Sequence, residues 1–253
     1  MRRRYPVEYI VGVEFKNHQY TNRGANMKKT IAIIGADGKM GSGMALSIAR
    51  AGYRVLVTDH DQEDLSSLIG RLPLLVGKIR LKVPQADIGI VVEPKEASWE
   101  ADIVIPTVPY QAQAAVATEI KDVVTGKIVI SVVNPLNHTS DNLLTAPTIS
   151  AAEELAAILP DSNVVKAFNT VFALEFKKPK TNGHSVDVFV AGDNDDAVGQ
   201  VMVLVKDIGF NPLWAGKLSM SRTLEGMMLL MTSLSRENNS QRPAGWKLLR
   251  SAV

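Results

Sequence analysis

The chain has 253 residues, a formal net charge of +2, 46% hydrophobic and 21% charged residues, a composition typical of a globular protein with one large or two small domains. It contains no cysteine, which excludes disulfides, thiolate catalysis and thiolate metal sites. The four histidines form no ligand-like pair, so we expect no metal site. No apolar run is as long as a transmembrane helix, so we expect no membrane span. No basic face is present, so we expect no nucleic-acid partner.

Residues 1–26 look like an appendage to the globular part of the chain. They carry five basic and two acidic residues, so the remainder is close to neutral. The apolar stretch at 9–15 is interrupted by Glu14 and has no small-residue cleavage site, which argues against a signal peptide. Met27 lies just before the first apolar run and resembles a natural start, so we predict an N-terminal extension over 1–26. A real extra strand within 7–15 is the alternative.

Residues 30–61 have the pattern of a strand, a glycine-rich turn, a helix and a second strand. Ile31–Ile34 is short, apolar and β-branched, Met44–Arg50 has helical spacing, and Val55–Thr58 is again β-branched. The second strand stops at Asp59. This is a βαβ unit of about 30 residues, the size of a dinucleotide-binding fingerprint.

The glycine turn has the spacing G-x-x-G-x-x-G. Gly35 permits a sharp turn, Gly38 lacks the side chain that would keep a pyrophosphate away, and Gly41 allows close packing of helix on strand. The commoner G-x-G-x-x-G would require glycine where Asp37 and Met40 stand, so the turn is one residue longer. Helix N–H groups then face the phosphates. The predicted phosphate-binding residues are Gly35, Ala36, Asp37, Gly38, Lys39, Met40 and Gly41.

Strands and helices continue to alternate after Asp59, whose carboxylate is placed to accept hydrogen bonds from an adenosine ribose. We expect Gly70 to end the next helix, and Pro73 and Gly77 to prevent a simple continuation. The predicted elements are a helix at 61–69, a strand at 88–92, a short connecting element at 94–99, a strand at 102–108, a helix at 111–124 and a strand at 128–133.

Continuous apolar strands that alternate with helices predict an α/β fold with a parallel, doubly wound sheet. Ligands bind such sheets beyond the carboxyl ends of the strands. The residues that follow the predicted strands should therefore share one rim with the glycine turn. They are Asp59, His60, Val108, Pro109, Asn134 and Pro135.

The second half adds a smaller helical and strand portion. Its predicted elements are a helix within 147–159, strands at 163–168, 186–191 and 211–214, and helices at 194–208 and 221–234. The last helix is apolar nearly all round, which predicts burial in the core. A dimer interface and a wall of a substrate cleft, where Met228 would contact a flat ring, are the alternatives.

Five motifs occur in a fixed order between residues 28 and 234: IIGADGKMGSGMA, DIVIPTVPYQA, SVVNPL, NVVKAFNTV and VDVFVAGDNDDA. Together they resemble the coenzyme F420-dependent NADP oxidoreductase family, which also includes the cytoplasmic domains of membrane ferric reductases. The resemblance implies a Rossmann domain at 27–160 that holds NADP(H), and a C-terminal portion at 161–253 that completes the sheet and closes a cleft for a deazaflavin ring. It also implies a cytoplasmic homodimer.

The resemblance and the residues disagree on the choice of nicotinamide cofactor. The family's usual Ser-Arg pair after the second strand, which holds the 2′-phosphate of NADP, is replaced here by Asp59-His60. A carboxylate about 3–4 Å from a phosphate is repelled by an energy on the order of several kcal/mol. A protonated His60 would instead favour NADP. On local charge we predict NAD, with NADP as the open alternative.

We find no general acid–base constellation and predict no catalytic side chain. Hydride transfer between two ring cofactors requires little beyond alignment and exclusion of water. Lys166 is expected to be structural, and Asn169 and Thr170 to line the cleft. The leading hypothesis is an oxidoreductase that moves hydride between NAD(P)H and coenzyme F420, a flavin or a related small redox partner. A non-catalytic dinucleotide sensor and a small-molecule NAD(P)-dependent dehydrogenase are the alternatives.

Overall fold

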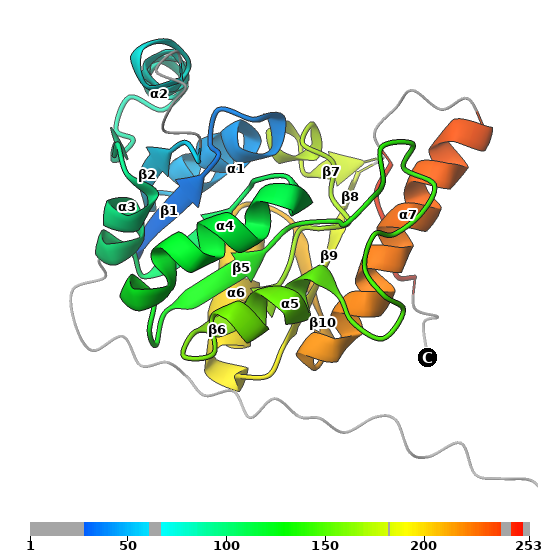
Figure 1. Ribbon diagram of the computed structural model, residues 1–253. Helices are drawn as coiled ribbons and strands as arrows, with labels where there is room; N and C mark the ends of the chain where they lie inside the picture. Colours follow the sequence, from blue (N-terminus) through cyan, green and yellow to red (C-terminus); the bar gives the residue numbers. More distant parts are fainter. Residues whose placement is uncertain (1–27, 61–66, 182, 239–243, 250–253) are drawn as a thin grey trace, which may run out of the picture.

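The computed structural model describes residues 28–60, 67–181, 183–238 and 244–249 (Figure 1). The predicted extension at 1–26 and the first part of the helix predicted at 61–69 lie outside the described residues. The strands are β1 (Thr30–Ile34), β2 (Arg54–Thr58), β3 (Ile88–Ile90), β4 (Ile103–Pro106), β5 (Ile128–Ser131), β6 (Asn163–Lys166), β7 (Lys180–Thr181), β8 (His184–Ser185), β9 (Asp187–Gly192) and β10 (Asn211–Gly216).

The helices alternate with the strands in the first part of the chain and are sparser in the second. They are α1 (Lys39–Arg50), α2 (Leu72–Lys82), α3 (Pro94–Glu100), α4 (Tyr110–Ile120), α5 (Ala151–Ile158), α6 (Asp195–Asp207) and α7 (Ser221–Glu237). The described residues also contain four short turns of other helix types, η1 (Ser67–Arg71), η2 (Lys121–Val123), η3 (Glu175–Lys177) and η4 (Leu218–Met220). None of the helices in the described ranges has the length and apolar character needed to cross a membrane.

One sheet of eight strands has the order β10-β9-β6-β5-β4-β1-β2-β3. From β3 to β6 all neighbours are parallel, which confirms the predicted doubly wound α/β sheet. The second half differs, because β9 pairs antiparallel with β6, and β10 then pairs parallel with β9. In the described part of the connection from β6 to β9 there is only η3 and the unpredicted β7–β8 hairpin, and no crossover helix. A parallel strand requires such a crossover, so the chain returns antiparallel.

Both edges of this sheet are irregular. β3 has only three residues, and it ends at Ile90. At the other edge, β10 contains Pro212, and its pairing register with β9 shifts between Trp214 and Gly216.

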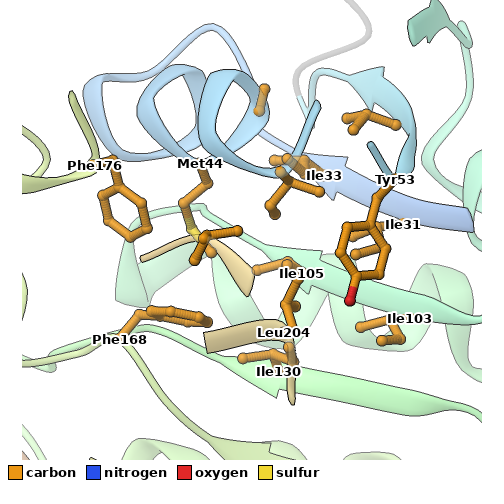
Figure 2. Close-up of a cluster of buried hydrophobic side chains, with 14 of the residues drawn as sticks. Ile31, Ile33, Met44, Tyr53, Ile103, Ile105, Ile130, Phe168, Phe176 and Leu204 are labelled. Carbon is orange, nitrogen blue, oxygen red and sulfur yellow. The ribbon is translucent and has the colours of Figure 1, made fainter. Parts of the chain in front are cut away.

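The helices cover the sheet in two layers (Figure 1). Side chains of α1, α2 and α6 pack on one face, and side chains of α3, α4 and α5 pack on the other. The layer of α1 and α6 includes Met44, Phe168 and Leu204 together with isoleucines of three strands, namely Ile31 and Ile33 of β1, Ile103 and Ile105 of β4, and Ile130 of β5 (Figure 2). Phe168, Phe176 and Phe210 form an aromatic group, with ring centroids 5.3–6.4 Å apart. Burial of each such side chain stabilises the fold by about 2 kcal/mol relative to leaving it exposed. The core therefore holds the strands in place, and with them the rim formed by the carboxyl ends of the strands.

The predicted helix end at Gly70 is wrong, since α2 continues through Pro73 and Gly77 to Lys82. Pro73 lies in the first turn, where its missing N–H is not needed. Gly77 is exposed and costs a helix only about 1 kcal/mol relative to alanine. Burial of an apolar stripe outweighs that cost; its residues are Leu72, Val76 and Ile79. The segment predicted at 94–99 as a connection likewise forms α3, begun by Pro94.

The prediction that the last helix is buried all round is also wrong. α7 buries Leu224, Met228 and Met231, but Leu230 and Leu234 on its outer side are 50% and 49% exposed. α7 lies beside α5 at the margin of the molecule, where the loop at 139–140 and the segment at 244–246 cover part of it (Figure 1). One face of this helix therefore packs on the core and one remains apolar and open.

Candidate cofactor site

The glycine turn lies at the carboxyl end of β1 and is held against the neighbouring strands. Gly35 has φ 78°, a conformation that favours glycine, and the backbone N–H groups of Gly35 and Ala36 both donate to the carbonyl of Thr58, at 2.9 and 3.1 Å. The hydroxyl of Thr107, after β4, donates to the carbonyls of Ile34 and Gly35. The turn is thus fixed by β2 and β4. Sequence reasoning missed Thr107, whose only signal is its position at a predicted strand end.

The start of α1 is open to an anion. Gly38 is its N-cap and provides no side-chain hydrogen bond, and the first turn contains no acidic residue. The first backbone N–H groups of a helix have no partner within the helix and carry the positive end of its dipole. Gly38 is exposed, and a Cβ added there would meet only the Gly35 carbonyl oxygen, at 3.4 Å. The space in front of Gly38 is therefore free for a phosphate.

Gly41 has a different role from Gly38. A Cβ on Gly41 would lie 2.5 Å from the carbonyl oxygen of Gly35 and 2.7 Å from both Ala36 Cα and Thr107 Oγ1. These distances are shorter than any real contact, so only glycine lets α1 pack this closely on the turn. The two glycines thus have the different roles predicted for them: Gly41 allows close packing, and Gly38 allows access of a ligand.

Asp59, at the end of β2, is buried, with 4% of its surface exposed. Its Oδ1 accepts a hydrogen bond from the backbone N–H of His60 at 2.7 Å and lies 3.0 Å from the Nδ1 atom of the His60 ring. Its Oδ2 lies 3.8 Å from the guanidinium of Arg71, which also pairs with Asp37 at 2.9 Å. Arg71 therefore links the glycine turn to the end of β2. No sequence pattern predicts this link, because Arg71 reaches the rim through η1.

A hollow of about 310 Å³ opens beside the start of α1, where β1, β4, β5 and β6 end. It brings together several predicted residues from distant parts of the chain, namely Lys39, Met40, Val108, Pro109, Asn134 and Asn169. Thr107, Tyr110, Phe172 and Ala173 also line it and were not predicted. Pro135, Thr170 and Met228 are buried outside the hollow. The Thr170 hydroxyl has no hydrogen-bond partner among the described residues.

Asn134 and Asn169 are joined across the hollow. Asn134 Nδ2 donates to the backbone carbonyl of Asn169 at 2.7 Å, and Asn169 Nδ2 donates to Asn134 Oδ1 at 3.0 Å and to the carbonyl of Leu224 at 2.8 Å. The preceding residue, Phe168, has φ 62°, which turns the chain sharply after β6. This conformation is unfavourable for a residue with a Cβ, and the buried aromatic group around Phe168 holds it.

Lys166 does not line the hollow and forms a buried ion pair instead. Its Nζ lies 2.6 Å from Oε1 of Glu225 on α7 and donates to the Val133 carbonyl at 2.5 Å, and neither side chain is more than 1% exposed. Glu225 Oε2 accepts a hydrogen bond from the backbone N–H of Ala151, at the start of α5. Burial lowers the pKa of Lys166, and Glu225 opposes this effect. The contacts are those of a structural residue, as predicted.

Glu175, in η3 beside the hollow, is a buried carboxyl group. Its Oε2 accepts a hydrogen bond from the N–H of Phe172 at 2.8 Å, and its Oε1 has no partner within the described part of the chain. Burial raises the pKa of Glu175 to about 7 from the ordinary 4.5, and the hydrogen bond opposes this only in part. Below about pH 7 the protonated form of Glu175 is therefore favoured in the folded protein.

This carboxyl group should make stability depend on pH. Because the folded pKa lies above the unfolded one, its contribution is complete below pH 4.5 and is lost as pH rises through about 7, by about 3 kcal/mol in total. Urea unfolding between pH 5 and 8 should show this loss in the wild type and not in Glu175→Gln. Glu96→Gln, an exposed glutamate on α3, is the control and should keep the wild-type profile. Parallel profiles for wild type and Glu175→Gln would contradict the assignment.

No group of three or more His, Asp or Glu side chains within the described ranges is arranged to hold a metal ion. The polar groups at the hollow are amides, a threonine hydroxyl, Lys39 and Tyr110, whose hydroxyl donates to Glu154 at 2.8 Å. Burial raises the pKa of Tyr110 to about 12. Such a site can bind and align ligands, and it contains no pair poised to exchange a proton near neutral pH.

Comparison with known proteins agrees with this geometry. Residues 30–135 match the model of the family described as NADP oxidoreductase, coenzyme F420-dependent. Over 222 residues the chain is 30% identical to the F420-dependent NADP reductase of Methanothermobacter marburgensis, covering 82% of this chain and 93% of that protein. The chain belongs to the coenzyme F420-dependent NADP oxidoreductase family.

Other relatives are consistent with this membership. The F420-dependent NADP reductase of Methanocaldococcus jannaschii is 29% identical over 83% of this chain and 94% of its own length. Human metalloreductase STEAP2 is 25% identical over 83% of this chain but only 38% of its own length. A crystal structure of a putative F420-dependent NADP reductase from Arthrobacter sp. FB24 has a TM-score of 0.71 at 22% identity, covering 83% of this chain and 95% of that one, and shows the shared fold. Membership of this oxidoreductase family makes the protein an NAD(P)-dependent oxidoreductase.

Proposed function

We propose that the protein transfers hydride between NADP(H) and coenzyme F420. The observation that carries the proposal is the uncapped start of α1 behind Gly38, which opens directly on the hollow shared by Asn134 and Asn169. The pyrophosphate in the middle of a dinucleotide suits the helix start, and the flat nicotinamide ring at one end suits the hollow. The relatives named F420-dependent NADP reductase support the identity of the two coenzymes.

The residues divide by the part of the ligands they serve. Gly35 to Gly41 hold the pyrophosphate, and Lys39, which lines the hollow, contributes a positive charge beside it. Val108, Pro109 and Asn134 hold the nicotinamide end, and Asn169 lies on the acceptor side. Pro135, Thr170 and Met228, which were also expected to contact the ligands, are buried outside the hollow and support its wall. Residues 27–160 are then the nucleotide-binding part. Residues 161–253 complete the sheet and cover the acceptor.

The bound coenzymes supply the hydride donor and acceptor rings. The chain contributes binding, orientation and exclusion of water, which suffice for this class of reaction. The Asn134–Asn169 pair fixes the carboxyl ends of β5 and β6 relative to one another, and the lining by Val108, Pro109 and Phe172 is apolar. Reduction of the acceptor ring also takes up a proton, which solvent supplies, because none of the described side chains that line the hollow is poised to donate one near neutral pH.

The same proposal includes a homodimer in the cytoplasm that binds no nucleic acid. The half-exposed Leu230 and Leu234 on α7 support self-association, because they extend an apolar face beyond the core. The near-neutral composition of residues 27–253 supports the absence of a nucleic-acid partner.

Cofactor oxidation measured by absorbance tests the function. NADPH should be oxidised when F420 is supplied under anaerobic conditions, and more slowly or not at all with FMN or FAD. Gly38→Val tests the phosphate site in the same assay, because the added side chain points outward and blocks only the phosphate. Its kcat/KM should fall by about 100-fold or more, and its melting temperature should stay at the wild-type value.

Two results would contradict the proposal. Tight NADPH binding with no turnover on F420, FMN or FAD would indicate a dinucleotide sensor. Turnover of a hydroxy acid without any flavin or deazaflavin would indicate a small-molecule dehydrogenase.

A further inference from the structure

Arg71 lies at the corner where the adenosine end of a dinucleotide would reach the protein. Its Nε is 2.9 Å from Asp37 in the glycine turn, and its NH2 group is 3.8 Å from Asp59 at the end of β2. A side chain at the end of β2 is the usual partner of the adenosine ribose, whose 2′-oxygen carries the extra phosphate of NADP. Arg71 is half exposed, so its guanidinium is accessible to a ligand at this corner.

A positively charged groove begins at the same corner. It has a volume of about 450 Å³ and runs between α1, α2 and η3, and it shares Lys39 and Ala173 with the hollow described above. Five cationic side chains and one carboxylate line it: Lys39, Arg71, Lys78, Lys82, Lys177 and Asp37. A groove with this excess of positive charge favours an anion at its mouth.

The charge of Asp59 is not directed at the ligand. Both of its oxygens face protein groups, Oδ1 the backbone and ring of His60 and Oδ2 the guanidinium of Arg71. The repulsion that led us to predict NAD from the sequence is therefore compensated in the folded chain. An arginine fork can contact carboxylates and a phosphate from different N–H groups.

We propose that Arg71 binds the 2′-phosphate of NADP and sets the preference for NADP over NAD. It does so from the turn before α2, whereas the arginine implied by the family resemblance directly follows β2. The inference rests on the proposed function, because it concerns the cofactor of that same site.

Equilibrium binding of four probes tests the inference: NADPH, NADH, 2′,5′-ADP and 5′-AMP. The wild type should bind NADPH more tightly than NADH, and 2′,5′-ADP more tightly than 5′-AMP, which lacks the 2′-phosphate. Arg71→Ala should weaken NADPH and 2′,5′-ADP by about 10- to 100-fold and NADH and 5′-AMP by less than about 3-fold. Lys82→Ala, at the far end of α2 in the same groove, is the matched control and should change all four by less than about 3-fold.

A second variant separates direct contact from uncovered negative charge. In Asp37→Asn/Arg71→Ala the carboxylate that Arg71 neutralises is also removed. The loss of 2′,5′-ADP affinity should persist, and Arg71→Lys should restore part of it. Wild-type affinity for 2′,5′-ADP in the double variant would overturn the proposal that the guanidinium binds the phosphate.

The remaining outcomes distinguish the two proposals. Equal affinity of the wild type for NADPH and NADH, or an equal loss of both in Arg71→Ala, would overturn the role of Arg71 and leave hydride transfer standing. Binding of neither cofactor by the wild type would overturn both.

Discussion

Glu225→Leu is expected to lower the free energy of unfolding by about 3–5 kcal/mol, because it leaves a lysine buried without its partner. Lys166 is fully buried, and among the described residues its Nζ would keep only the Val133 carbonyl as a hydrogen-bond acceptor in this variant. The N–H of Ala151 would lose its acceptor as well. Burial already lowers the pKa of Lys166. The loss of stability in Glu225→Leu should therefore grow as pH falls, because the buried amine must then be protonated without its partner.

Urea unfolding of Glu225→Leu, Lys166→Met and the double variant measures the coupling. The double variant should be more stable than either single one, since it leaves no charge unpaired. Glu237→Gln, on the exposed end of the same helix, should change stability by less than about 0.5 kcal/mol. Additive losses in the double variant would show that the two side chains do not stabilise each other.

Gly41→Ala should destabilise the fold by about 3 kcal/mol or more and abolish cofactor binding. The added Cβ would overlap the Gly35 carbonyl and Ala36 Cα, both backbone, so no side chain can move to relieve the clash. The helix must shift away from the turn, and its N–H groups move with it.

Gly38→Ala is the matched control for this substitution. Its Cβ meets only one atom, at 3.4 Å, and its φ of −66° suits alanine, so stability should change by less than about 1 kcal/mol. Thermal unfolding and NADPH titration of both variants distinguish the two roles. A Gly41→Ala protein with wild-type melting temperature would mean that α1 and the turn are less closely packed than described.

The parts of the fold that could be predicted are those encoded locally. Continuous β-branched runs and glycine spacing are read within about ten residues, and they located β1, the turn, α1 and the strands up to β6. The rim then followed from the rule for parallel sheets, which explains why Val108, Pro109, Asn134 and Asn169 were found to share one hollow.

The parts that could not be predicted depend on contacts between distant segments. Pro73 and Gly77 were read as helix breakers, but burial of one stripe of α2 overrides their propensity. The reversal of β9 depends on the geometry of a connection that has no helical period to read. Arg71 meets Asp37 and Asp59 only through the turn before α2, so its place at the cofactor corner required the structure.

The irregular edges of the sheet limit how molecules of this protein can aggregate. An exposed, regular edge strand is a template for strand addition from another chain, which is how domain-swapped and fibrillar assemblies grow. β3 is too short to pair over more than three residues, and β10 combines a proline that lacks an N–H with a break in register. Concentrated protein should therefore resist growth by sheet extension, and association between native molecules is left to the helical surfaces.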